Sequence, residues 1–225
     1  MNVAIINFVV QSTLPREVNH TESFGMNQID DPARDLSEIR SMMERSSKFL
    51  SLSGMAGVSA GCAALAGAAA AWWRLGRAGE GEGTPGPAGF LAADAVVVLF
   101  LALGLAVFFT TRRARTDGIA VWSGTTKRLL LALLVPLSAG GIFSLLLWYH
   151  GLVMLVPPVT LIFYGLALFN SARYTVPEVQ YLASGEILLG LASALYLDSW
   201  LPFWAAGFGV LHIAYGTALY LKYEK

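Results

Sequence analysis

Two ionisable side chains stand inside stretches of sequence that are otherwise almost entirely apolar. Glu186 lies 12 residues before Asp198, and His212 lies 10 residues after Pro202, on the other side of a short turn. At about 1.5 Å of rise per helical residue, both side chains would lie roughly 15–18 Å from that turn. Because the two side chains would lie at similar distances from the turn, we expect the carboxyl group and the imidazole ring to contact each other.

Such a pair has a small set of chemical uses inside a membrane. A carboxyl group beside an imidazole can relay protons, gate a cavity or bind the polar head of a solute. Tyr164 and Tyr215 add hydroxyl groups as further binding or proton-relay candidates. The alternative is a hydrogen-bonded clasp that fixes helix register, worth about 0.6 kcal/mol on average. One polar pair is little evidence for transport, so the clasp is favoured.

Small residues accompany both ionisable groups at helical spacing. Glu186 shares a face with Gly190, and His212 shares a face with Gly209 and Gly216. Small residues allow two helix backbones to approach closely. We therefore expect the two faces to meet each other and to bring Glu186 against His212.

The composition indicates a membrane protein. Of 225 residues, 56% are hydrophobic and only 13% are charged, which is too apolar for an ordinary soluble domain. Crossing about 30 Å of hydrocarbon takes roughly 20 apolar residues in a helix. Four runs of about that length lack Asp, Glu, Lys and Arg altogether: Phe49–Trp73, Leu129–Tyr149, Gly151–Ala172 and Trp200–Leu221.

The pattern predicts an all-α polytopic bundle with six transmembrane helices. Their expected positions are about 49–73, 90–110, 129–149, 152–171, 179–197 and 201–221. Residues 49–225 form this transmembrane domain, and residues 1–30 are expected to be a poorly ordered extension. Residues 31–48 have the spacing of an amphipathic helix on the inner leaflet, or of a helix that continues the first span or packs on the cytoplasmic loops.

Lysine and arginine residues set the expected orientation. If the N-terminus is inside, the outer side receives only Arg74 and Arg77, and all the other basic residues near the spans are cytoplasmic. This asymmetry is the one that membrane insertion follows. We therefore expect a multi-pass protein of the cell inner membrane with both termini in the cytoplasm. Tryptophans agree, since five fall at expected outer ends: Trp72, Trp73, Trp148, Trp200 and Trp204.

Parts of the chain resemble one another. "IFYGLALF" at 162–169 matches "IAYGTALY" at 213–220, and "LGLAVFF" at 103–109 is a weaker third copy. "SSKFLSLSGMAGVSAG" at 46–61 likewise matches "TTKRLLLALLVPLSAG" at 125–140. Each unit would be a helical hairpin, and the hairpins would be parallel repeats. Chance identity is the alternative, because Ala, Gly and Leu dominate these helices.

Gly57 and Gly61 form a stripe with Ser53, in which a small residue recurs at every fourth position. Such a stripe lets another helix come close. The partner is a neighbouring span of the same chain or a second copy in a homo-oligomer, and packing within the chain is favoured.

Several functions are not indicated. The net charge is zero, so we expect no nucleic-acid partner; the expected partner is the lipid bilayer, and no ligand is identified. Cys62 is the single cysteine, which excludes a disulfide within the chain and any CxxC motif. No metal site, cofactor or catalytic motif is recognised, so we expect no enzyme.

Three stretches, "IRSMMERSSKFLSLSG", "LIFYGLALFN" and "FWAAGFGVLHIAYG", resemble a family of uncharacterised bacterial six-span inner-membrane proteins. The resemblance runs from about Asp35 to the C-terminus and implies no activity. It does place His212 inside the family motif, which strengthens the case for a functional histidine. The expected function is a non-enzymatic structural, regulatory or sensing role; the alternative is a small-solute transporter or proton-coupled permease that uses Glu186 and His212.

Overall fold

The computed structural model of the chain describes residues 52–77, 87–118 and 120–225, all within the compact unit Glu44–Lys225. The expected N-terminal extension, 1–30, and the expected amphipathic helix, 31–48, lie outside the described residues. The described part consists of helices and the turns between them, without a β-strand. The prediction of an all-α chain is confirmed for these residues.

Every expected span has a helical counterpart. The first five are α3 (Gly54–Gly76), α4 (Pro87–Thr116), α5 (Gly124–Tyr149), α6 (Val156–Ser171) and α7 (Val179–Leu195). The sixth is one continuous helical stretch, called the last helix, made of α8 (Trp200–Trp204), the π-helix η4 (Ala205–Leu211) and α9 (His212–Tyr223). Short 3-10 turns lie at η1 (Val153–Leu155), η2 (Ala172–Tyr174) and η3 (Leu197–Ser199).

Four of these helical segments are long and apolar enough to cross a membrane: α3, α4, α5 and the stretch Val153–Tyr174 that contains α6. α7 is also apolar, but its 17 residues make it shorter than these four segments. In the last helix, η4 replaces the regular α-helical turns by wider ones. The described residues therefore contain four candidate spans by length and composition, against the six that the sequence predicts.

Local signals account for several helix ends. Ser123 caps α5, since its Oγ accepts a hydrogen bond from the Thr126 N–H at 3.1 Å, the usual role of a serine at this place. Pro157 and Pro158 stand in the first turn of α6, where the missing N–H has no helical partner to lose. Gly151 has a φ of 74° and turns the chain between α5 and η1.

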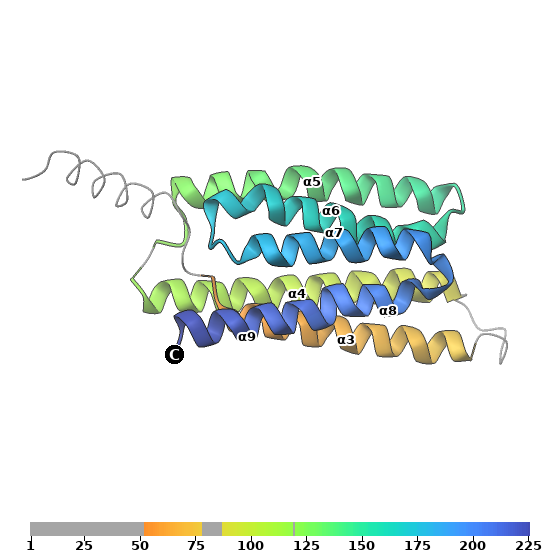
Figure 1. The fold of residues 1–225 in the computed structure, drawn as a ribbon, viewed down its shortest axis with the longest axis horizontal. Coiled ribbons are helices and arrows are strands. Elements are labelled where there is room, and N and C mark those ends of the chain that lie inside the picture. Colours follow the sequence, from red (N-terminus) through yellow and green to blue (C-terminus); the bar gives the residue numbers. More distant parts are fainter. Residues whose placement is uncertain (1–51, 78–86, 119) are drawn as a thin grey trace, which may run out of the picture. The chain divides into compact units, whose positions relative to one another are not determined.

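The helices lie alongside one another (Figure 1) in a definite order of neighbours. α4 packs on α3, α3 packs on the last helix, the last helix packs on α7 through α8 and η4, α7 packs on α6, and α6 packs on α5. The first and last helices of this row, α4 and α5, make no comparable contact with each other. Both carry many exposed large apolar side chains, as expected for surfaces that face hydrocarbon.

The Gly57 and Gly61 stripe is covered within the chain. A Cβ atom on Gly57 would lie 2.9 Å from the Cα of Gly216, and one on Gly61 would lie 2.6 Å from the carbonyl oxygen of Gly209. Both glycines of α3 thus allow the last helix to approach more closely than any larger residue would permit. This is the intramolecular packing that the sequence analysis favours.

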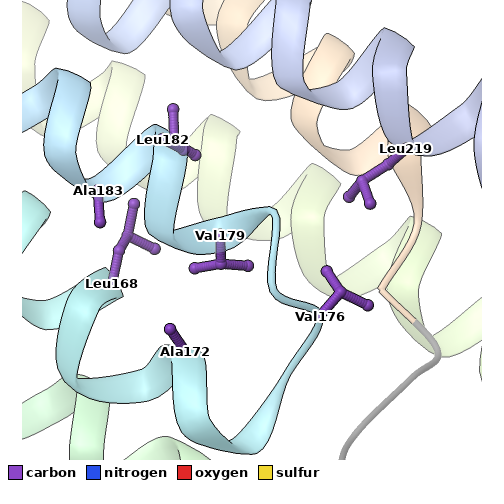
Figure 2. Packing of buried hydrophobic residues seen from close by; sticks show 7 residues of the cluster. All are labelled: Leu168, Ala172, Val176, Val179, Leu182, Ala183 and Leu219. Carbon is purple, nitrogen blue, oxygen red and sulfur yellow. The ribbon is translucent and has the colours of Figure 1, made fainter.

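An apolar core joins α6, α7 and α9 near one end of the bundle (Figure 2). Figure 2 shows Leu168 and Ala172 facing the start of α7, with Leu219 approaching from α9. The remaining members are Val176, Val179, Leu182 and Ala183. This end, at which α4 and α9 finish and α7 begins, is called the basic end, because it carries Arg113, Lys127, Arg173 and Lys222.

Arg113 ties three chain segments together at the basic end. Its guanidinium donates hydrogen bonds to the carbonyl oxygens of Leu52 at 3.1 Å and Tyr223 at 3.0 Å, and it pairs with Glu224 at 2.5 Å. The Glu224 carboxylate also accepts a hydrogen bond from the Gly54 N–H. One side chain of α4 therefore holds the beginning of α3 against the end of α9.

A second ionic contact joins α7 to α9 at the same end. Lys222 and the Tyr223 hydroxyl both donate hydrogen bonds to Oε1 of Glu178, which precedes α7. Partial burial raises the pKa of the Glu178 carboxyl, but the hydrogen bonds from Lys222 and Tyr223 outweigh that effect and leave the pKa below its ordinary value. The contact thus favours the ionised carboxylate.

We expect Arg113→Ala to lower the free energy of unfolding by about 1–3 kcal/mol, because charged hydrogen bonds are lost and acceptors are left unpaired. Thermal unfolding of the purified protein in detergent measures this. Arg115→Ala is the matched control, since Arg115 is an exposed residue of the same helix. An equal loss for both variants would contradict the role of Arg113 in holding α3 against α9.

The contribution of Glu178 should depend on pH. A lowered carboxyl pKa in the folded state stabilises the protein above the ordinary pKa of about 4.3, and this stabilisation is lost as the pH falls through the folded value. Between pH 7 and pH 3, the melting temperature should therefore fall further for the wild type than for Glu178→Gln. The difference should be small, because the pair is solvated. Asp198→Asn, which changes an exposed carboxylate at the opposite end, should leave the pH profile unchanged.

Candidate functional site

Three helices bring the candidate site together. Tyr164 lies in α6, Glu186 in α7, and His212 is the first residue of α9. His212 directly follows η4, whose sequence AAGFGVL is rich in small residues. π-helical turns are rare and occur often at functional sites. The candidate site therefore sits where the last helix departs from regular α-helical geometry.

The predicted contact between Glu186 and His212 is confirmed. Nδ1 of His212 lies 3.2 Å from Oε1 of Glu186. The same nitrogen lies 3.2 Å from the carbonyl oxygen of Gly207, five residues earlier in the chain, and forms a hydrogen bond with it. On the other side of the ring, Nε2 is hydrogen-bonded to the Tyr164 hydroxyl at 2.8 Å.

These distances assign the proton of a neutral ring. A carbonyl oxygen only accepts hydrogen bonds, so the Gly207 contact requires the proton on Nδ1 of His212. The unprotonated Nε2 then accepts the hydrogen bond from the Tyr164 hydroxyl. If the ring is protonated on both nitrogens, Nε2 donates to the tyrosine oxygen instead. Tyr164 can serve either state because a hydroxyl both donates and accepts.

The Glu186 carboxyl group is fully buried, with 0% exposure. Neither of its oxygens has a well-aligned hydrogen bond within the described residues, even though Nδ1 of His212 is near. An isolated buried charge is costly. Two arrangements avoid it: a neutral acid beside a neutral imidazole, or a carboxylate beside an imidazolium. Both leave the pair with no net charge, and they differ by the position of one proton.

Gly207 provides the room for the carboxyl group, a role that the sequence analysis missed. A Cβ atom on Gly207 would lie 2.5 Å from Oε2 of Glu186 and 2.5 Å from Cδ2 of Leu161. The signal was present in the sequence, because Gly207 precedes His212 by five residues. A spacing of five residues is informative only in a π-helix, in which residues five apart lie on the same side of the helix. In an α-helix, residue 207 would point away from His212.

One prediction about how α7 and the last helix pack is wrong. The small-residue faces of α7 and the last helix do not meet each other. Gly190 packs against Ile162 of α6, whereas Gly209 packs against Leu65 of α3 and Gly216 against Gly54 of α3. Glycines therefore bring α7 to α6 and the last helix to α3.

Aromatic rings line the site on the side of α6 and η4. The Tyr164 ring lies 5.4 Å from the His212 ring and 5.1 Å from Phe208, centroid to centroid. Phe208 in turn lies 5.0 Å from Trp204. Such separations are typical of packed aromatic pairs. His212 is itself only 6% exposed, so the polar atoms of the site are enclosed by side chains.

Tyr215, the fourth candidate, is placed differently. It packs, like Tyr164, against the apolar core formed by α6, α7 and α9, but its buried hydroxyl has no hydrogen-bond partner within the described residues. The structure therefore brings Tyr164, Glu186 and His212 together by direct contacts and does not join Tyr215 to them by a hydrogen bond.

The described residues contain no group of three or more His, Cys, Asp or Glu side chains that could hold a metal ion. No protein-family model, curated protein or solved structure matches the chain. The geometry of the three side chains is accordingly the basis for any functional inference.

We expect Gly207→Ala to destabilise the protein by about 1–3 kcal/mol, because the added methyl group overfills the space next to Glu186. Gly141→Ala is the matched control. Gly141 is a helical glycine with open space around its Cβ position, so alanine there should be neutral or stabilising by up to about 1 kcal/mol. Thermal unfolding measures both variants, and the same sign of change for both would contradict the role of Gly207.

Proposed function

We propose that the chain is a six-span bacterial inner-membrane protein with both termini in the cytoplasm. Four long apolar helices support a membrane location. α7 and the last helix would supply the remaining two spans. The orientation is supported by the basic residues of the basic end, set against Arg74 and Arg77 at the opposite ends of the helices. Lysine and arginine accumulate on the cytoplasmic side.

The proposal includes construction from parallel hairpin repeats, supported by two interfaces with the same contacts. A Cβ atom on Gly165 would meet Ile187 N at 3.0 Å and Ala183 O at 2.8 Å, where α6 packs on α7. A Cβ atom on Gly216 would meet Val58 N at 2.5 Å and Gly54 O at 2.5 Å, where α9 packs on α3. Gly165 and Gly216 are equivalent in the motifs "IFYGLALF" and "IAYGTALY".

For the role, we propose a non-enzymatic structural or sensing function in which Tyr164, Glu186 and His212 lock three helices together. The enclosed packing of the Glu186 carboxyl group supports this most directly. The carboxyl is fully buried, and even one added methyl group on Gly207 would collide with it. A tight site of this kind favours a lock over a passage for solutes. The lock holds the last helix in register against α6 and α7.

A proton-coupled permease is the second candidate. It is favoured by the two Glu186 oxygens, which lack aligned hydrogen bonds, and by the adjacent π-helix. A carboxyl group with spare hydrogen-bonding capacity is a suitable proton carrier, and ionisable residues within membranes often mark proton pathways. In this candidate, a proton would pass between Glu186 and His212 during transport.

Removal of the imidazole tests the lock. His212→Ala leaves the Tyr164 hydroxyl and the Glu186 carboxyl without their shared neighbour, so we expect a loss of about 1–3 kcal/mol in the free energy of unfolding. His150→Ala, at an exposed turn position, is the control and should stay within about 0.5 kcal/mol of the wild type. Thermal unfolding in detergent measures both, and a stable His212→Ala variant would remove the lock.

Infrared difference spectroscopy separates the two candidates. The carboxyl band that disappears in Glu186→Gln belongs to Glu186, and its intensity reports protonation. For a lock that protons do not reach, we expect no change in this band from pH 5 to pH 8. A band that titrates in this range, and that shifts in His212→Ala, would overturn the lock and support proton transfer.

A further inference from the structure

Four exposed basic residues lie on the two sides of the connection between α4 and α5. Arg112 and Arg115 belong to the last two turns of α4, and Lys127 and Arg128 belong to the first two turns of α5. All four are exposed, and none of them pairs with an acidic side chain among the described residues. They are called the hairpin cations.

The acidic side chains described at the basic end are already engaged by other basic residues. Asp117 lies 3.4 Å from Arg113, and Glu224 pairs with the same guanidinium. Glu178 pairs with Lys222. Because these carboxylates are taken, the charge of the hairpin cations is not compensated by the described part of the chain. An uncompensated cluster of one sign attracts ligands of the opposite sign.

An exposed tryptophan accompanies the hairpin cations. Trp122 is 66% exposed, and Nζ of Lys127 lies 5.8 Å from the centroid of its ring, which is a cation–π contact. Tryptophan and lysine together are typical of the headgroup level of a membrane. The other five tryptophans belong to the opposite end of the helices: Trp72, Trp73, Trp148, Trp200 and Trp204.

An apolar stripe of α5 begins directly beside these cations. Leu131 follows Lys127 by four residues and Arg128 by three, so all three share a helix face. Leu134 and Val135 continue this face one turn further. The three apolar side chains are 64%, 53% and 64% exposed, respectively. The start of α5 thus presents positive charge at its end and hydrocarbon along its side.

We propose that the start of α5 is a binding site for an anionic phospholipid. Lys127 and Arg128 bind the phosphate group, Arg128 through two parallel hydrogen bonds and Lys127 as a point charge. The acyl chains lie along Leu131, Leu134 and Val135. Clusters of roughly four to eight Lys and Arg residues beside a membrane helix commonly recognise anionic lipids. The inference rests on the membrane location proposed above.

Two other occupants fit less well. A soluble phosphate would neutralise Lys127 and Arg128 but would leave the stripe of Leu131, Leu134 and Val135 uncovered. A zwitterionic phospholipid would cover the stripe, but its headgroup also carries an ammonium group, which the hairpin cations repel. Each basic residue near the membrane surface favours an anionic lipid by roughly five-fold. Charge and apolar surface together therefore favour the anionic phospholipid.

Trp122 serves as the reporter for the experiment. The full-length protein is placed in phosphatidylcholine liposomes with increasing fractions of brominated phosphatidylglycerol or brominated phosphatidylcholine, since bromine on a neighbouring acyl chain quenches tryptophan fluorescence. Subtracting the signal of Trp122→Phe isolates Trp122. We expect half-maximal quenching of Trp122 at a fraction of brominated phosphatidylglycerol at least about five-fold lower than that of brominated phosphatidylcholine.

Charge variants identify the residues that bind the headgroup. Lys127→Gln combined with Arg128→Gln should remove the preference for phosphatidylglycerol, whereas Lys127→Arg combined with Arg128→Lys keeps the charge and should retain most of it. Arg77→Gln is the matched control, because Arg77 lies over the ring of Trp73, at 4.2 Å, at the opposite end of the helices. It should leave the quenching of Trp122 unchanged.

The outcomes separate failure of the site from failure of the membrane location. Equal quenching of Trp122 by both lipids, or an unchanged preference in the Lys127→Gln, Arg128→Gln variant, would overturn the lipid site alone. Absence of quenching by either lipid would overturn the membrane location as well. Replacing chloride by inorganic phosphate at equal ionic strength should leave the quenching unchanged. Selective displacement of the lipid by phosphate would assign the site to a soluble anion and refute the proposal.

Discussion

Close backbone contact at two glycines is the constraint on which the remainder of the bundle depends. Gly165 seats α6 on α7, and Gly216 seats the last helix on α3. Lipid chains are as apolar as leucine, so burial of apolar area contributes little to helix association in a membrane, and close van der Waals packing must supply it. These two contacts fix two helix pairs, α6 with α7 and the last helix with α3. Gly207 against Glu186, and Gly185 against Leu211, then join α7 to the last helix and keep Glu186 near His212.

The packing also gives the Glu186 carboxyl group its partner. A carboxyl group in hydrocarbon is tolerated only with a partner, and Glu186 has its partner because α7 and the last helix are held at a fixed separation. Tyr164 extends the contact to α6 through Nε2 of His212. The polar group therefore joins three helices, and any movement of the last helix would change its hydrogen bonding. This coupling suits a lock or a sensor.

The local patterns of the sequence predicted much of the fold and part of the site. Apolar length predicted helices at all six places, and depth along the chain predicted the contact of Glu186 with His212, because rise per residue is a property of the helix itself. The helix that each small residue contacts was less predictable. Gly190, Gly209 and Gly216 were expected between α7 and the last helix, yet they contact α6 and α3. A small residue indicates close approach but does not identify the partner.

The sequence by itself determined the helical class, the apolar segments and the depth of the two ionisable residues, since these follow from composition and helix geometry. Only the tertiary structure decided which helices are neighbours, that Gly207 makes room for the carboxyl group, and that Gly165 and Gly216 each meet another helix whereas Gly104 has open surroundings among the described residues. The physical reason is that short-range steric fit selects among helix partners, and steric fit depends on atoms brought together from distant parts of the chain.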